Sequence, residues 1–127
     1  MKNKIAFIIS LGLMFLLVHD SNAQKIETGF CYRLTTEWQG TAKSLEVVND
    51  DKKESVQLGA TESGSWQEWK LTPLNDGYYR ITSAWVDTNG KSVDILNDGK
   101  NNNQLTLAKT GNYTGQHWKL TKVRPVD

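Results

Sequence analysis

The sequence contains few of the residues that build catalytic and metal sites: among 127 residues, one is cysteine and two are histidine. A lone cysteine cannot form a disulfide within the chain, and this set cannot assemble a Cys/His zinc cluster. His19 lies in the apolar N-terminal segment, which leaves His117 as the only histidine for a Ser-His-Asp or Cys-His device. We therefore expect no metal and no cofactor, and among enzymes only a carboxylate enzyme stays open.

Long apolar runs are also scarce, and the single one lies at the N-terminus. Two lysines precede an apolar run over residues 5–18, and Ser21 and Ala23 put small residues at both positions that a signal peptidase reads. A membrane-spanning helix needs roughly 20 apolar residues, more than this run supplies. The sequence therefore predicts a signal peptide over residues 1–23 and a secreted chain, extracellular or periplasmic, over residues 24–127 without a membrane span.

Neither sign of charge is in excess once this signal is removed. Residues 1–23 hold two of the 15 basic and one of the 14 acidic side chains, so 13 of each remain. A chain with zero net charge has no broad field to attract nucleic acid or anionic lipid. We therefore expect no nucleic-acid partner.

Proline occurs only twice, yet no segment shows a sustained helical period. Instead, short stretches alternate apolar and polar residues with period two, as half-buried strands do. Turn-forming clusters such as residues 75–77 and 97–100 separate them. The eight stretches centre on residues 32–34, 45–47, 56–60, 69–71, 79–81, 93–95, 105–107 and 118–120. These features predict an all-β domain of eight short strands.

The chain also repeats itself. The matching segments are 32–35 with 79–82, 43–47 with 91–95, 49–50 with 97–98, 57–58 with 104–105, and 67–71 with 116–120. Their offsets differ by one or two residues, which places the length differences in turns. The repeat divides the domain into two four-stranded lobes, residues 32–71 and 79–120.

Each lobe opens with Tyr-Arg, continues with Lys-Ser-apolar-acidic-apolar and Gln-Leu, and closes with Gln-x-Trp. This order resembles the ricin B-type lectin family over residues 32–120. The resemblance implies a β-trefoil, in which three four-stranded lobes close a barrel. Only two lobes are present, so we expect a trefoil-like fold that is incomplete within one chain. Two forms would satisfy this: an open two-lobe sandwich held by the terminal segments, or a homo-oligomer that shares lobes.

The two Gln-x-Trp motifs are interpreted first as structural. Gln67 and Trp69, like Gln116 and Trp118, are two residues apart and share a strand face. The indole can then fill the lobe interior while the amide bonds the backbone at a turn. We therefore expect Trp69 and Trp118 in the core.

The resemblance also implies a sugar site in the second lobe. It assigns three side chains to sugar hydroxyls: Asp94, Gln104 and Gln116. Two positions depart from the family pattern, because Thr106 replaces the stacking aromatic residue and Gly115 replaces an asparagine. Tyr113, in the preceding loop, is a candidate to place its ring over the pocket instead, and Asn102 or Asn103 to add an amide.

The first lobe lies further from the pattern and implies a weaker site. Its counterparts are Glu46, Gln57 and Gln67, with Gly59 at the aromatic position and Trp66 at the asparagine position. Glu46 has one more methylene than aspartate, which loosens the placement of its carboxylate.

The sequence raises three candidate functions. The first is a secreted, non-catalytic lectin-like module that binds carbohydrate or glycoconjugates. The second is a protein-binding trefoil module, an inhibitor or adhesin, whose sugar sites have decayed. The third, a carboxylate glycosidase, needs two acidic groups flanking one bond. Glu46 and Asp94 occupy equivalent places in different lobes, so they should lie far apart, and we expect no enzyme.

Overall fold

The computed structural model describes residues 25–125, so the predicted signal peptide over residues 1–23 lies outside the described part. Residues 25–125 form eight β-strands and four short 3-10 helices, which confirms the all-β prediction. The strands are β1 (Cys31–Tyr32), β2 (Lys43–Val47), β3 (Val56–Ala60), β4 (Trp69–Pro73), β5 (Tyr78–Ser83), β6 (Lys91–Ile95), β7 (Leu105–Lys109) and β8 (Trp118–Lys119). The helices are η2 (Ser65–Gln67), η3 (Asn75–Gly77), η4 (Val86–Thr88) and η5 (Thr114–Gln116). None of the helices in residues 25–125 is long and apolar enough to cross a membrane.

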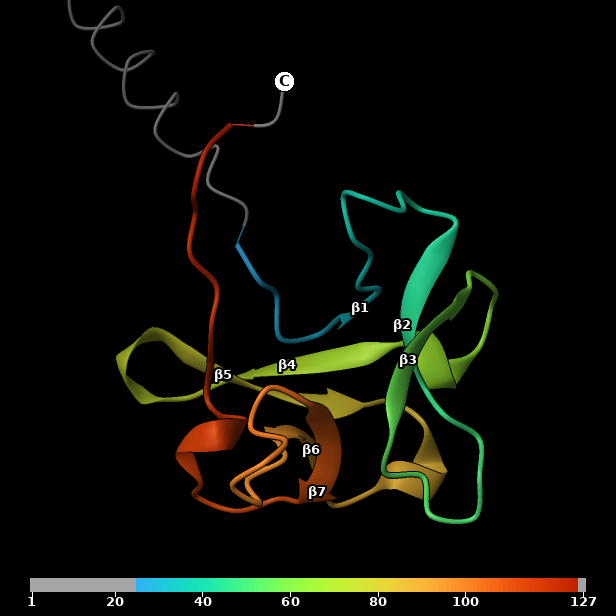
Figure 1. Ribbon diagram of the computed structural model, residues 1–127. Helices are drawn as coiled ribbons and strands as arrows, with labels where there is room; N and C mark the ends of the chain where they lie inside the picture. Colours follow the sequence, from blue (N-terminus) through green and yellow to red (C-terminus); the bar gives the residue numbers. More distant parts are fainter. Residues whose placement is uncertain (1–24, 126–127) are drawn as a thin grey trace, which may run out of the picture.

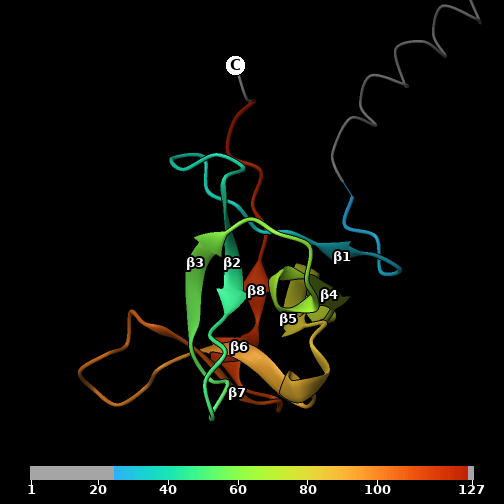
Figure 2. The same ribbon diagram turned by 90° about the vertical axis from the view of Figure 1, so that its right-hand side faces the viewer.

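The strands form one four-stranded antiparallel sheet and two hairpins. The sheet has the order β1-β4-β5-β8, while β2 pairs with β3 and β6 with β7 (Figure 1; β8 is labelled in Figure 2). In each lobe the first and fourth strands belong to the sheet and the middle two form the hairpin. The lobes join where β4 pairs with β5, through a tight turn that contains Asp76 and Gly77 at φ of 61° and 79°. Both residue types tolerate this left-handed backbone, which explains the turn signal in the sequence.

The core lies between the sheet and the two hairpins. It consists of Val47, Trp69, Val93 and Leu107, with six half-buried apolar side chains around them. Trp69 is fully buried and Trp118 is half-buried. Each indole donates one hydrogen bond to a strand carbonyl of its own lobe: Trp69 Nε1 to Leu45 O and Trp118 Nε1 to Val93 O, both at 3.0 Å. The two lobes therefore repeat in space as well as in sequence.

The hairpin registers correct the sequence alignment of the third strands. Glu46 lies opposite Gln57 in the first lobe, whereas Asp94 lies opposite Thr106 in the second. Gln57 therefore corresponds to Thr106, and the match of Gln57 with Gln104 was wrong by two residues. A shift of two keeps every side chain on the same face of a strand, so alternation alone could not reveal it.

Candidate functional site

The second lobe carries an open cleft of about 640 Å³ beside β6. Its lining combines one carboxylate with several amides and a tyrosine. The residues are Asp94, Ile95, Asn97, Asn102, Asn112, Tyr113, Thr114 and Gly115. The cleft therefore contains three of the predicted site residues, Asp94, Asn102 and Tyr113, from separate segments, whereas Asn103 does not line it.

The Asp94 carboxylate is fixed by one hydrogen bond to each oxygen. Gln116 Nε2 donates to Oδ2 at 2.9 Å, and the Ile95 backbone N–H donates to Oδ1 at 2.7 Å. A carboxylate oxygen can accept two bonds, so both oxygens keep capacity for a ligand. Asp94 is half-buried, which leaves this capacity accessible from the cleft.

Gln116 holds the carboxylate from inside the fold. Its side chain is fully buried, and its Nε2 also donates to Lys109 O at 2.9 Å while its Oε1 accepts from Gly111 N at 3.1 Å. The amide thus joins the end of β7, the following loop and the cleft floor. Gln116 therefore contacts Asp94 from within the fold and does not itself line the cleft.

Gly115 is explained by the position of Asp94. A Cβ atom at residue 115 would overlap Asp94 Oδ1, so any larger residue would displace the carboxylate. Gly59 has the same relation to the Glu46 carboxylate in the first lobe. Two departures from the family pattern therefore make room for the acidic side chains.

A tight turn presents two of the cleft amides. Asp98 Oδ1 accepts the backbone N–H groups of Lys100 and Asn101 at 2.9 and 2.7 Å, and Asp98 Oδ2 accepts from the Asn101 side chain at 2.7 Å. These hydrogen bonds, led by the one from the Asn101 side chain, lower the pKa of Asp98 below its ordinary value of 3.8. The turn fixes the backbone between Asn97 and Asn102, and both of these residues line the cleft.

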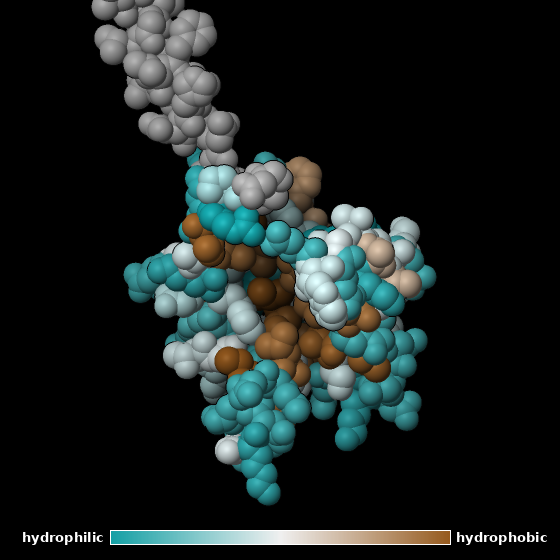
Figure 3. Space-filling model, turned by 45° about the horizontal axis from the view of Figure 1, so that its top comes forward, coloured by the Kyte–Doolittle hydropathy of each residue, from teal (hydrophilic) through white to brown (hydrophobic). Residues whose placement is uncertain are grey.

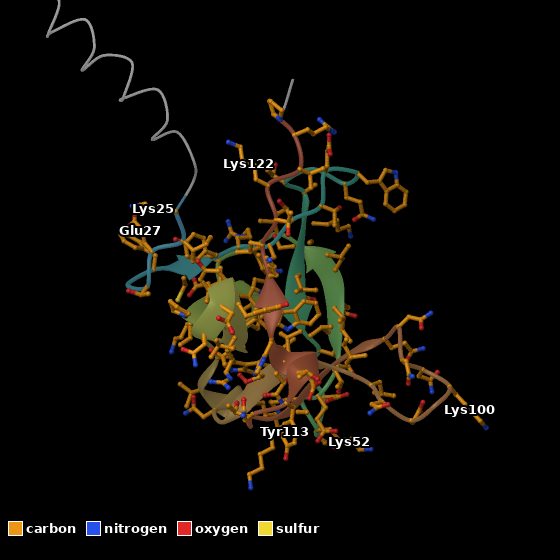
Figure 4. The ribbon with its side chains drawn as sticks, turned by 90° about the vertical axis from the view of Figure 1, so that its left-hand side faces the viewer. Lys25, Glu27, Lys52, Lys100, Tyr113 and Lys122 are labelled. Carbon is orange, nitrogen blue, oxygen red and sulfur yellow. The ribbon has the colours of Figure 1, made fainter. Side chains whose placement is uncertain are left out.

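Tyr113 forms the outer wall of the cleft. Its side chain is 62% exposed, and its ring lies over Gly111, where a Cβ atom would overlap it. Figure 4 places Tyr113 at the end of the molecule opposite Lys122. The ring is therefore both supported from behind and open to solvent.

Gln104 does not belong to this site. It lies outside β7, where its carbonyl accepts from Leu96 N at 2.9 Å, and it lines a separate hollow between the two hairpins. The lining of the Asp94 cleft therefore lacks Gln104, whose assignment followed the misaligned third strand. Thr106 lies opposite Asp94 instead, and its hydroxyl donates to Glu54 O at 3.0 Å.

The first lobe brings its three predicted residues together. Glu46 Oε1 accepts from Gln57 Nε2 and Glu46 Oε2 accepts from Gln67 Nε2, both at 2.8 Å. Gln67 is fully buried and also donates to Ala60 O at 2.7 Å. Two side-chain amides therefore occupy the Glu46 carboxylate, whereas only one occupies that of Asp94.

The wall of the first-lobe cleft includes two tryptophans, and the sequence did not predict that they lie side by side. The cleft measures about 480 Å³, and its lining includes Glu46, Glu62, Trp66 and Trp85. The two indoles meet edge to face with their centroids 6.5 Å apart. Trp66 follows β3 and Trp85 follows β5, so only the packing of one lobe on the other joins them.

Asn49 and Asn97 were a second missed feature, although the repeat contained the signal. Asn49 lines the first cleft and Asn97 lines the second, at matching places in the two lobes. In both lobes the following aspartate caps the turn, since Asp50 Oδ1 accepts from Lys52 N and Lys53 N as Asp98 does from its own turn. The repeated Asn-Asp pair thus combines a cleft amide with a turn cap.

Within residues 25–125, no three His, Cys, Asp or Glu side chains gather closely enough to hold a metal ion.

Comparison with solved structures shows the fold. The chain is similar to the crystal structure of the designed threefold symmetric protein ThreeFoil, with a TM-score of 0.62 and 24% identity. The match covers 78% of this chain and 69% of ThreeFoil, close to two of three symmetric repeats. The described residues therefore form an all-β, β-trefoil-like fold with two four-stranded lobes.

Comparison with curated proteins gives a relative that is similar in sequence to most of this chain. The chain is 31% identical to Pierisin of Pieris brassicae over 105 residues, which cover 82% of this chain. It spans only 11% of the length of Pierisin. No protein-family model matches the chain.

Proposed function

We propose that this protein is a secreted, non-catalytic, lectin-like module that binds sugar hydroxyls in the second-lobe cleft. The observation that supports it most is the Asp94 carboxylate, which the buried Gln116 holds at 2.9 Å and Gly115 leaves open to the cleft. Binding geometry is most selective when such a group is held rigidly from behind. The predicted signal peptide over residues 1–23 would direct export of the module to a compartment where glycans occur.

The chemistry of the cleft suits a carbohydrate. A carboxylate can accept two neighbouring hydroxyl groups in charge-assisted hydrogen bonds. The side-chain amides of Asn97, Asn102 and Asn112 line the same cleft and can both donate and accept. The exposed ring of Tyr113 offers a face for the apolar C–H patch of a sugar. An open cleft of this kind supports weak single-site binding, on the order of millimolar, or about −4 kcal/mol.

The second cleft does not suit hydrolysis. Asp94 is the one acidic residue among the described residues that line it. Hydrolysis of a glycosidic bond ordinarily uses a pair of carboxyl groups across that bond. Glu46 lines the other cleft, in the other lobe. These observations support binding without catalysis in the second cleft.

A protein-binding module is the second candidate, and the first lobe favours it. Both oxygens of Glu46 are already engaged by amides of the chain, while Trp66 and Trp85 line the same cleft with two indoles. Such a cleft offers apolar contact more readily than hydroxyl recognition. A protein ligand would use this aromatic wall and leave Asp94 uninvolved.

A glycan array separates the two candidates. We expect the wild-type protein to retain at least one class of glycan, Asp94→Asn to lose it, and Asp51→Asn, a change on an exposed loop, to keep it. The asparagine variant preserves shape while removing charge, so far-UV circular dichroism should be unchanged. Absence of retained glycans, or retention by Asp94→Asn, would rule out the sugar site. Export of the full chain, with Gln24 as the new N-terminus by mass spectrometry, tests secretion separately.

A further inference from the structure

The four-stranded sheet has two open edges within the described residues. β1 pairs only with β4 and β8 only with β5, so each outer strand has a neighbour on one side. Figure 3 shows hydrophobic side chains gathered in a hollow on the face that carries the chain ends. Unpaired strand edges beside an apolar surface favour association.

The junction between the two lobes shows what such an edge accepts. Along β4 and β5, Leu71 lies opposite Ile81 and Lys70 lies opposite Thr82. This pairing leaves Leu71 only 5% exposed. The junction thus packs the buried Leu71 beside the half-buried Ile81 and sets a lysine against a threonine.

The two open edges carry the same residues. Residues 32–35 (Tyr-Arg-Leu-Thr) correspond to residues 79–82 (Tyr-Arg-Ile-Thr), and residues 118–121 (Trp-Lys-Leu-Thr) correspond to residues 69–72 of the same sequence. Pairing the two edges in the junction register would set Leu120 opposite Leu34 and Lys119 opposite Thr35. The edges are therefore complementary to each other in the same way as β4 and β5.

The side chains at the open β8 edge are more exposed than their counterparts on β4, so this edge has no partner strand within a single described chain. Leu120 is 54% exposed, whereas its counterpart Leu71 is 5% exposed. Trp118 is half-buried where Trp69 is fully buried. Residues 120–125 lead from β8 toward the loop between β1 and β2 (Figure 2), where Thr121, Val123 and Arg124 line a shallow hollow with Glu37. Arg124 and Glu37 form an exposed ion pair there at 3.4 Å. No backbone hydrogen bond joins residues 118–125 to residues 30–37 in the described chain.

We propose that the occupant of both edges is a second copy of this chain. β8 of each copy pairs with the 32–36 segment of the other, in the register of the β4–β5 junction. Two such junctions related by a twofold axis pair both open edges of each copy, in a ring of four lobes instead of the three that close a trefoil. The ring also presents two Asp94 clefts, so weak single-site binding gains from multivalency. The association itself does not depend on sugar binding.

Sedimentation equilibrium of the purified chain tests the proposal, which predicts a concentration-dependent dimer. Leu120→Asp removes the apolar pair from both junctions and should weaken dimerisation by about tenfold or more per junction. Val86→Asp, at a side chain 72% exposed and far from the edges in sequence, is the matched control and should remain dimeric. A monomer at every concentration, a larger open assembly, or a dimer that Leu120→Asp does not weaken would overturn the proposal.

A pair of charge changes tests the register in which β8 pairs with the 32–36 segment of the other copy. Thr35→Lys would face Lys119 of the other copy and should weaken the dimer about two- to thirtyfold over the two junctions. Adding Lys119→Glu to Thr35→Lys should restore it, because opposite charges then face each other. Both side chains are exposed, so the fold should be unaffected. Failure of Lys119→Glu to restore the Thr35→Lys dimer would contradict the pairing of β8 with the 32–36 segment of the other copy.

Discussion

Gln116 Nε2 lies 2.9 Å from Asp94 Oδ2, with the glutamine fully buried and the aspartate at the cleft. The same relation joins Gln67 to Glu46 at 2.8 Å in the first lobe. In both lobes the glutamine of the Gln-x-Trp motif thus connects the core to the acidic residue of the cleft. The motif serves the fold and the site at once.

Replacing Gln116 with leucine should therefore affect stability and binding together. Gly111 N–H would lose its buried acceptor, at a cost of about 1 to 3 kcal/mol in the free energy of unfolding. The Asp94 carboxylate would also lose its support, so glycan affinity should fall. Urea unfolding and glycan titration measure the two effects.

Gln67→Leu is the matched control for that variant. It breaks the equivalent bonds in the first lobe and should destabilise the fold to a similar degree, yet leave glycan affinity unchanged. Equal loss of affinity in both variants would show that binding follows stability rather than the position of Asp94.

The close approach of Gly115 to Asp94 gives a second prediction. In Gly115→Ala the new methyl group would overlap Asp94 Oδ1 and turn the carboxylate away from its bond with Ile95 N. We expect weaker glycan binding with the fold retained, measured by titration and near-UV circular dichroism. Gly29→Ala, where no atom lies within 4 Å of the added carbon, should bind as the wild type does.

The eight strands could be predicted because period-two alternation and turn residues are local properties. The lobe boundaries followed from the repeat for the same reason. The third-strand register could not be predicted, since moving Gln104 by two residues preserves its face of the strand. The Trp66–Trp85 wall was also beyond prediction from one lobe, because the two indoles meet only when β5 pairs with β4.

The two core tryptophans should differ in their contribution to stability. Trp69 is fully buried, so Trp69→Ala should cost about 3 to 5 kcal/mol and unfold much of the protein. Trp118 is half-buried, so Trp118→Ala should cost less in the monomer. Urea unfolding of each variant measures the difference, and a larger loss at residue 118 would contradict the packing described above.

Asp98 gives a pH-dependent prediction. Hydrogen bonds from Asn101 and Lys100 lower its pKa in the folded protein below 3.8. A lowered folded-state pKa stabilises the turn at pH values above 3.8, and this contribution is lost as the pH falls through the folded-state value. An NMR titration of the Asp98 carboxyl carbon should give a midpoint below 3.8, and Asn101→Ala should raise it. A midpoint at or above 3.8 in the wild type would exclude the turn cap.

The most direct test of sugar recognition is an NMR titration of the isotope-labelled protein with a glycan that the array retains. We predict shifts in the side-chain amide signals of Asn97, Asn102 and Asn112 and in the ring signals of Tyr113, all of which line the Asp94 cleft. The indole signals of Trp66 and Trp85 should stay in place. Shifts confined to those two indoles, or no shifts at any of these side chains, would contradict binding at Asp94.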